Sequence, residues 1–285
     1  MASAENSGDR VLRETRWASV IIVAVLLPAL VILWGLPTET KTLWAWTIKP
    51  AMTPIFMGAS YGAGAYFFMR LALSRRWHVA SAGVLSAAIF AAFMLVVTLV
   101  HFNKFNHGHA PFLAAVAFYG WTSVYIVSPF AVAWLWLRNQ RTDARRLEPG
   151  DQSVPPLVRY IARAVSAGAI ALGIIFLLSP PTANDVWAWK LTPLTAGVIG
   201  SFMIQVGVGS LLLALDERWS SWRLLLETFL IATALMLVGA IREWSKLDHS
   251  NASTWIFVAG LAASALAILL LFRAMEAKPV PGAAL

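Results

Sequence analysis

Apolar residues gather into eight long runs along this chain, and short segments between the runs hold most of the charged residues. Each run spans roughly 18–25 residues, which is enough for a helix to cross a hydrocarbon core of about 30 Å. The pattern predicts eight transmembrane helices in an all-α integral membrane protein. The expected spans are Ala18–Leu36, Met52–Leu73, Val79–Val100, Phe112–Leu137, Leu157–Leu178, Leu194–Leu215, Leu224–Ile241 and Trp255–Phe272.

The second half of the chain repeats the first. Trp44-Ala45-Trp46, followed by Pro50, returns as Trp187-Ala188-Trp189, followed by Pro193, and the register then continues at an offset of 142 residues. Pairs at that offset include Gly58 with Gly200, Arg76-Trp77 with Arg218-Trp219, Met94–Val96 with Met236–Val238, and Lys104 with Lys246. This period is far longer than that of solenoids. The sequence therefore predicts two tandem parallel four-helix repeats, residues 1–142 and 157–285, joined by a cytoplasmic linker at 143–156.

The charge distribution sets the expected orientation. Sixteen of the 22 basic residues fall on one side of the predicted membrane and six on the other. Loops rich in Lys and Arg stay in the cytoplasm, so we expect both termini to be cytoplasmic in a multi-pass protein of the cytoplasmic (inner) membrane. Because each half has four spans, both halves insert in the same direction, and a pseudo-two-fold axis along the membrane normal should relate them.

Composition agrees with a lipid environment. The chain is 59% hydrophobic and 13% charged, with a mean hydropathy of +0.70, whereas soluble domains carry about 25% charged residues. The net charge of +8 does not indicate a nucleic-acid partner, because the basic residues lie between apolar runs instead of on a soluble domain. The absence of cysteine excludes disulfides, thiolate metal sites and cysteine nucleophiles. The polar first 16 residues lack a cleavage site, so we expect the first span to be an uncleaved helix.

The segment between the halves is rich in arginine from Arg138 to Arg146. These residues set the topology, and the alternative is that they also bind anionic lipid of the bilayer. Most tryptophans lie near predicted membrane boundaries, where indole rings form an aromatic belt. They are Trp17, Trp77, Trp134, Trp136, Trp219 and Trp222 on the cytoplasmic side, and Trp34, Trp44, Trp46, Trp187, Trp189, Trp244 and Trp255 on the outer side.

Two outer motifs that both halves share are candidates for ligand binding. One is a lysine followed by a polar residue and histidine: Lys104 with His107, and Lys246 with Asp248 and His249. A cation near an imidazole at a helix end can bind a phosphate headgroup or organic anion. The alternative is structural, with the histidine hydrogen-bonded within its loop.

The other shared motif is the tryptophan pair, Trp44 with Trp46 and Trp187 with Trp189. Two residues apart in an extended segment, the indoles share a face. They form either an interfacial anchor or an aromatic wall around an apolar or cationic ligand between the halves.

Three outer histidines, His101, His107 and His109, are weak candidates for metal binding. The second half retains only His249, so we expect no metal, no cofactor and no catalytic residue. No charged residue lies at the centre of a span, which disfavours an ion pump. Glu227 is the charged residue nearest to the centre of a span, and it lies four residues after Arg223. This spacing predicts an ion pair at the membrane boundary; the alternative is a buried functional carboxylate.

Several segments carry a resemblance to a family. WAWTIKP, SRRWH, HFNKFNHGH and WLRNQRTD in the first half, and WAWKLTPLTAGVIG in the second, resemble a group of bacterial multi-spanning membrane proteins. The resemblance covers nearly the whole chain and implies a multi-pass membrane fold. It implies no activity and no catalytic residue.

These observations favour a non-enzymatic protein that binds or translocates a small or lipid-like molecule at the interface of the two repeats, with a site open to the outer face. Such a site needs a cavity between the second and sixth spans. One alternative is a structural or accessory subunit of a larger complex, with a membrane protein partner or a second copy on its apolar surfaces. Another is a membrane enzyme or redox protein that uses the His-rich outer loop.

Overall fold

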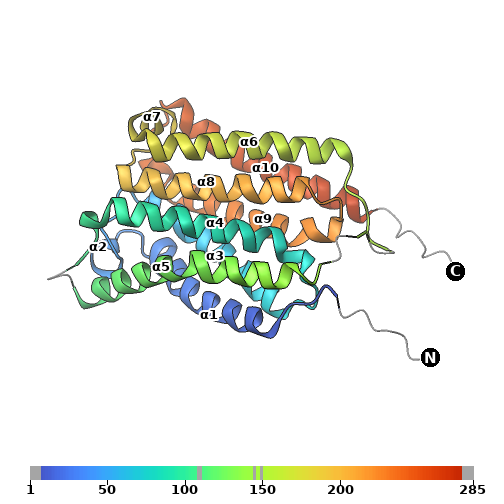
Figure 1. The fold of residues 1–285 in the computed structure, drawn as a ribbon. Helices are drawn as coiled ribbons and strands as arrows, with labels where there is room; N and C mark the ends of the chain where they lie inside the picture. The colour runs from blue at the N-terminus through green and yellow to red at the C-terminus, as the bar shows by residue number, and fades with distance from the viewer. Residues whose placement is uncertain (1–7, 108–110, 144–145, 148–149, 278–285) are drawn as a thin grey trace, which may run out of the picture.

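The computed structural model describes residues 8–107, 111–143, 146–147 and 150–277. Within these ranges the regular elements are helices that lie side by side in one bundle (Figure 1). The long helices are α1 (Arg13–Leu30), α3 (Met52–Leu73), α4 (His78–Val100), α5 (Phe112–Gln140), α6 (Pro156–Leu178), α8 (Pro193–Ala214), α9 (Trp219–Arg242) and α10 (Ala252–Glu276). Short elements are η1 (Val31–Gly35), α2 (Thr40–Leu43), η2 (Phe102–Lys104), α7 (Pro180–Val186) and η3 (Trp244–Lys246).

Seven helical segments in the described part of the chain are long and apolar enough to cross a membrane. They are Arg13–Gly35, which joins α1 to the π-helical η1, and α4, α5, α6, α8, α9 and α10. The all-α fold and the multi-pass membrane character expected from the sequence are thus confirmed. The predicted second span forms α3, a helix of 22 residues. It is not among these seven segments, and glycine and tyrosine recur along it.

The long helices of the two halves interleave. Within each half, the first span packs on the second and the third on the fourth: α1 on α3 and α4 on α5, then α6 on α8 and α9 on α10. Between the halves, α3 packs on α9, α8 on α4, and α4 on α9. The second span of each half therefore lies against the third span of the other half. Helix α1 begins and α10 ends at the same end of the bundle, which we call the terminal end; the opposite end is the distal end (Figure 1).

Glycines allow the helices of the two halves to approach closely. A Cβ atom added at Gly239 of α9 would lie 2.2 Å from Ile55 of α3, and one added at Gly197 of α8 would lie 3.0 Å from Val97 of α4. These two contacts are equivalent, because Gly197 aligns with Ile55 and Gly239 with Val97 at an offset of 142. The second span of a half supplies the glycine in one contact, and the third span supplies it in the other. Close approach of this kind maximises van der Waals contact, which drives helix association where lipid is the solvent.

Aromatic side chains fill the seam between α3 and α8 at mid-depth. Phe202 lies 5.7 Å from Phe56 and 4.5 Å from Phe90 between ring centroids, and these three rings are buried. The hydroxyl groups of Tyr61 and Tyr125 hydrogen-bond to each other at 2.9 Å in the same region. The second and sixth spans are thus the most buried helices, but the seam between them is closely packed.

The outer surface of the bundle is apolar. Large hydrophobic side chains are exposed along α1, α5, α6 and α10, among them Phe130, Leu157 and Ile256, each at least 70% exposed. Apolar surface of this extent is stable only against lipid or another protein. Helix α10 is the extreme case, because only Thr254 and Met275 of its 25 residues are buried.

The glycine contacts generate a test of the packing. A Cβ at Gly200 of α8 would lie 2.7 Å from the backbone oxygen of Gly173 on α6, and backbone cannot move aside as a side chain can. We expect Gly200→Ala to destabilise the protein by about 1–3 kcal/mol through overpacking. Thermal unfolding in detergent measures this effect. The control Gly168→Ala on α6 has no neighbour within 4 Å of the new Cβ and should be neutral or slightly stabilising. Equal midpoints for the two variants would contradict the packing.

Candidate functional site

The first tryptophan pair lies in the core at the distal end. Trp44 and Trp46 are 8% and 3% exposed, and both contact Trp121 of α5 with edge-to-face geometry. The loop after α4 is tied to them, because the Asn106 side chain donates to the Trp44 carbonyl and its backbone N–H to the Ala45 carbonyl. These rings serve as packing groups of the first half.

The second tryptophan pair is arranged in the same way and also contacts the first half. Trp187 and Trp189 are each 8% exposed and pack against Phe257 of α10 and Phe56 of α3. The Trp189 indole donates a 2.9 Å hydrogen bond to Thr53 Oγ1, which links the halves. The indole N–H groups of Trp44, Trp46 and Trp187 have no partner within the described residues. The site on the outer face that the sequence suggested is thus occupied by packed aromatic rings.

The lysine and histidine candidates lie on the distal surface, separately in each half. Lys104 and His107 are exposed, and the His107 ring stacks on Phe102 at 5.8 Å. Lys246 pairs with Glu243 at 2.5 Å, and the exposed His249 ring lies 4.7 Å from Trp244. In these contacts the lysine and histidine candidates of each half pair only with residues of their own half.

The Asp248 side chain is hydrogen-bonded within its own turn. Its Oδ1 accepts hydrogen bonds from the hydroxyl and the backbone N–H of Ser250, and these bonds lower the pKa of the Asp248 carboxyl. The carboxylate is therefore engaged within the loop.

The described residues contain no cluster of three or more His, Asp or Glu side chains that could hold a metal ion. His101 Nδ1 lies 3.1 Å from the Val97 carbonyl oxygen on its own helix. The third candidate, His109, is outside the described residues.

Glu227 has different partners from those expected. Its Oε2 accepts from Tyr66 at 2.7 Å and from Arg70 at 2.9 Å, both on α3, while Arg223 pairs with Glu276 at 3.1 Å. The i, i+4 spacing suggested Arg223, but the cross-packing of α3 on α9 supplies a nearer cation from the other half.

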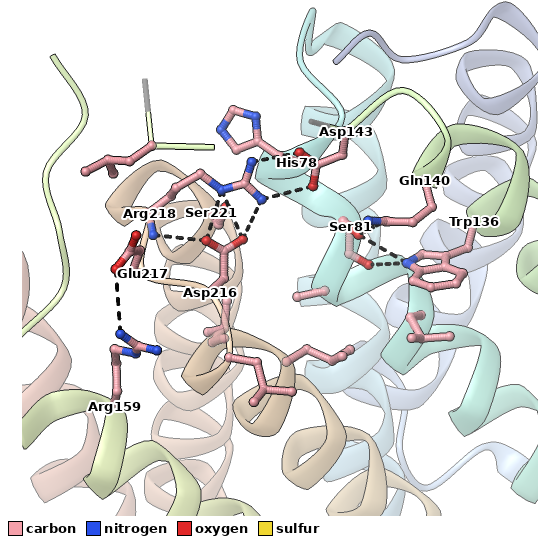
Figure 2. A pocket seen from close by; sticks show the side chains of 16 residues that line it. His78, Ser81, Trp136, Gln140, Asp143, Arg159, Asp216, Glu217, Arg218 and Ser221 are labelled. Carbon is pink, nitrogen blue, oxygen red and sulfur yellow. Dashed lines mark hydrogen bonds and ion pairs between the residues drawn. The ribbon is translucent and has the colours of Figure 1, made fainter. Parts of the chain in front are cut away.

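A cavity of about 340 Å³ lies at the terminal end, where the two halves meet. Its lining comes from the start of α4, the end of α5 and the residues that follow it, the start of α6, the end of α8 and the start of α9 (Figure 2). Ligand sites of small molecules begin at about 300 Å³. The cavity has the minimum size for such a site, and it lies opposite to the end that the sequence favoured.

One wall of the cavity is an ion cluster whose charged groups are paired with one another. Arg218 donates to both carboxylate oxygens of Asp143 at 2.8 and 2.9 Å, and to both oxygens of Asp216 at 2.7 and 2.9 Å (Figure 2). Burial would raise the pKa of the Asp216 carboxyl, but the hydrogen bonds and charge of Arg218 outweigh it and hold that pKa below its ordinary value. The guanidinium thus ties the chain after α5 to the loop before α9.

The opposite wall is polar but uncharged. Gln140 Oε1 accepts from the Ser81 hydroxyl at 2.6 Å and from the Trp77 indole at 3.1 Å, and the Trp136 indole donates to Ser81. Between the walls the lining becomes apolar, with Leu85 of α4 about two turns deeper than the start of that helix. The cavity therefore has a polar mouth and an apolar floor.

The helix contact at the floor of the cavity has an equivalent elsewhere in the bundle. The α4–α8 contact that forms its floor is equivalent, at an offset of 142, to the α3–α9 contact. In that second contact Tyr66, Arg70 and Glu227 form the ion cluster described above. The corresponding positions here are Val208, Leu212 and Leu85, and the two leucines line the cavity. Shorter, uncharged side chains thus accompany the open site.

Sequence reasoning did not find the cavity or the Arg218 cluster. The sequence marks Arg218 as half of a repeated Arg-Trp pair and as one of the basic residues, and it gives no signal for Asp143 or Asp216. The offset of 142 does carry the information, because it aligns the Tyr66, Arg70 and Glu227 group with three apolar residues. A difference of this kind within a repeat marks where the two halves cannot serve the same purpose.

The low pKa of Asp216 predicts how stability depends on acid. A carboxyl whose pKa is lower in the folded than in the unfolded state stabilises the fold above its unfolded pKa, and this contribution is lost as the pH falls through the folded pKa. We expect the thermal midpoint of the wild-type protein to fall as the pH is lowered from 5 to 3. Asp216→Asn should start lower at pH 5 and fall less. A variant with the full wild-type acid dependence would contradict the role of the cluster.

No protein-family model, curated protein or solved structure matches this chain. The function must therefore be argued from the geometry of the site.

Proposed function

We propose that this is an eight-span protein of the cytoplasmic membrane, built from two parallel four-helix repeats, that binds a small or lipid-like molecule in the terminal-end cavity between them. The role is non-enzymatic binding or translocation. The observation that carries the proposal is the cavity at one of two equivalent helix contacts, where the other contact has the hydrogen-bonded group of Tyr66, Arg70 and Glu227 in place of apolar residues.

The chemistry of the lining supports an amphiphilic ligand. The mouth offers Ser81, Gln140 and the Arg218 ion cluster, and the floor offers leucines at the depth where α4 enters the apolar core. A molecule with a polar head and a short apolar body satisfies both regions at once. Arg159 and Glu217, 3.9 Å apart at the rim, supply one charge of each sign for the head.

The repeat and the orientation are supported by paired features. The helices η2 and η3, Phe102–Lys104 and Trp244–Lys246, occur at an offset of 142, and so do the buried positions Gly58 and Gly200. Most of the basic residues flank the terminal end, which the positive-inside rule assigns to the cytoplasm. The cavity then opens to the cytoplasm.

Lipid contact at the arginine-rich segment is part of the same proposal. Arg138 pairs with Glu14 at 3.3 Å and lies over the Trp134 ring, while Arg141 is exposed beside them. A basic segment at this level attracts anionic headgroups. Enrichment of anionic over zwitterionic lipid in the gently purified protein measures the contact; equal retention would contradict it.

A second candidate function is that of a subunit in a larger membrane complex. It is favoured by α10, which among the long helices packs mainly on α9 and leaves most of its side chains exposed. A membrane protein partner or a second copy of this chain would cover that face. A second protein mass that remains bound in mild detergent would favour this function over ligand binding.

The binding proposal predicts that the cavity can be closed by copying its counterpart. The triple variant Val208→Tyr, Leu212→Arg and Leu85→Glu places the ion cluster of the α3–α9 contact into the α4–α8 contact. Native mass spectrometry of the gently purified wild-type protein should show a retained small molecule. The triple variant should fold and lose that mass by tenfold or more.

The control for this experiment is Leu266→Arg on the exposed surface of α10, which adds a charge far from the cavity and should retain the molecule. Ala82→Phe is a second, single change that narrows the same cavity. Retention of an unchanged ligand by both the triple variant and Ala82→Phe, or no ligand in the wild-type protein, would contradict the proposal.

The orientation predicts which loops are accessible from outside. Because the chain has no cysteine, single cysteines can be introduced without background labelling. A membrane-impermeant maleimide should label Ser245→Cys at the distal end in intact cells. It should label Arg75→Cys at the terminal end only after the membrane is permeabilised. The reverse pattern would place both termini outside.

A further inference from the structure

The first turns of α4 and α9 are each capped by an aspartate from the segment before the first span of their own half. Asp9 accepts from the backbone N–H of His78 at 2.8 Å and contacts the His78 ring through its other oxygen. Asp151 accepts from the backbone N–H of Ser220 at 3.2 Å and from the Ser220 hydroxyl through its other oxygen. Asp9 and Asp151, like His78 and Ser220, are 142 residues apart. The capping arrangement therefore occurs once in each half.

These two caps meet across the interface between the halves. His78 Nε2 lies 2.8 Å from Ser220 Oγ, which joins the two pairs into one chain from Asp9 through His78 and Ser220 to Asp151. His78 is 3% exposed, so water does not replace these partners. Because α4 packs on α9, this contact lies where equivalent helices of the two halves meet.

The protons that these four side chains can donate indicate the charge of His78. The Asp9 carboxyl is buried, which would raise its pKa, but the hydrogen bonds from His78 outweigh burial and keep that pKa below its ordinary value. An ionised carboxylate only accepts, so His78 Nδ1 donates to it. Ser220 spends its single hydroxyl proton on Asp151, and its oxygen must therefore accept from His78 Nε2–H. Both ring nitrogens donate, as in an imidazolium.

The same count argues against a nucleophilic serine. Aspartate, histidine and serine follow one another as in a hydrolase triad, and Ser220 borders a second cavity of about 320 Å³. In a triad, however, the histidine accepts the serine proton. Here that proton is directed to Asp151, and the histidine is a donor. The arrangement holds two helices together and does not activate a hydroxyl.

Charged groups from several elements surround these four residues. Asp9 and Asp151 lie at the two ends of the hydrogen-bonded series, and Asp143, from the segment after α5, acts on Asp9 through space. Arg218, two residues before Ser220, is paired with Asp143 and Asp216. On its own side, Arg75 and Arg76 precede His78 in the loop before α4. The Asp9 carboxylate thus contacts the ring directly, while the arginine on the α9 side has its own partners.

We propose that Asp9, His78, Ser220 and Asp151 form a proton-dependent latch that fastens the terminal ends of the two halves to each other. The latch is closed when His78 carries both ring protons. When Nε2 loses its proton, two acceptors face a single serine proton, so either the bond to Asp151 or the bond to His78 is lost. This inference does not rest on the proposed ligand, although His78 also borders the cavity.

The test follows the thermal midpoint of the purified wild-type protein in detergent from pH 5.5 to 9.5. We expect the midpoint to fall by about 4 °C over this range as the latch opens. His78→Ser, which gives the first half the residue of the second, should abolish most of that fall. His249→Ser, the same substitution at an exposed histidine, should retain it.

Nitrogen-15 NMR of the wild-type protein with labelled histidine provides a second measurement, which stands even if His78→Ser does not fold. Both His78 nitrogens should show protonated shifts at pH 6, and Nε2 should lose its proton over the pH range in which the midpoint falls. A neutral His78 ring at pH 6, a flat wild-type profile, or an unchanged pH dependence in folded His78→Ser would overturn the latch. None of these results depends on retention of a ligand.

Discussion

The cross-packing of α3 on α9 and of α8 on α4 is the contact on which the rest of the structure depends. In lipid, apolar surfaces gain nothing by leaving their solvent, so helices associate through close packing and a few polar contacts. Gly239 against Ile55 and Gly197 against Val97 provide the close packing in both crossings. Each half contributes its second span to one crossing and its third span to the other. Neither half could fill its own core without its partner.

This cross-packing also explains where cavities and charges occur. It creates two equivalent helix contacts, which differ at three positions near the terminal end. Tyr66, Arg70 and Glu227 are hydrogen-bonded to one another in one contact, because a carboxylate at that depth needs a cation and a hydroxyl to satisfy it. The leucines of the other crossing cannot form such a cluster. The site is therefore a consequence of the fold combined with three divergent positions.

The long helices and the membrane character could be predicted from the sequence, because run length and composition depend on the chain alone. Their boundaries were less accurate: α1 begins at Arg13 and α9 at Trp219, ahead of the expected Ala18 and Leu224. The partners of side chains could not be predicted in the same way. Hydropathy places Trp44 and Trp187 near a boundary, but burial depends on which helix covers them. The i, i+4 spacing likewise paired Glu227 with Arg223, whereas Arg70 arrives from a helix 157 residues away in sequence.

A duplicated fold can keep at both copies what folding needs and change at one copy what function needs. Gly58 with Gly200 and Asp9 with Asp151 are the same residue in each half, and they serve helix contact and helix capping. His78 against Ser220 and Leu85 against Glu227 differ, and both differences lie at the terminal end on α4 and α9. With serine at both position 78 and position 220, the two aspartates could still cap both helices. Such a pair would have no side chain that gains or loses a proton near neutral pH. The proposed site and the proposed latch both depend on these differences between the halves, and not on the residues that the halves share.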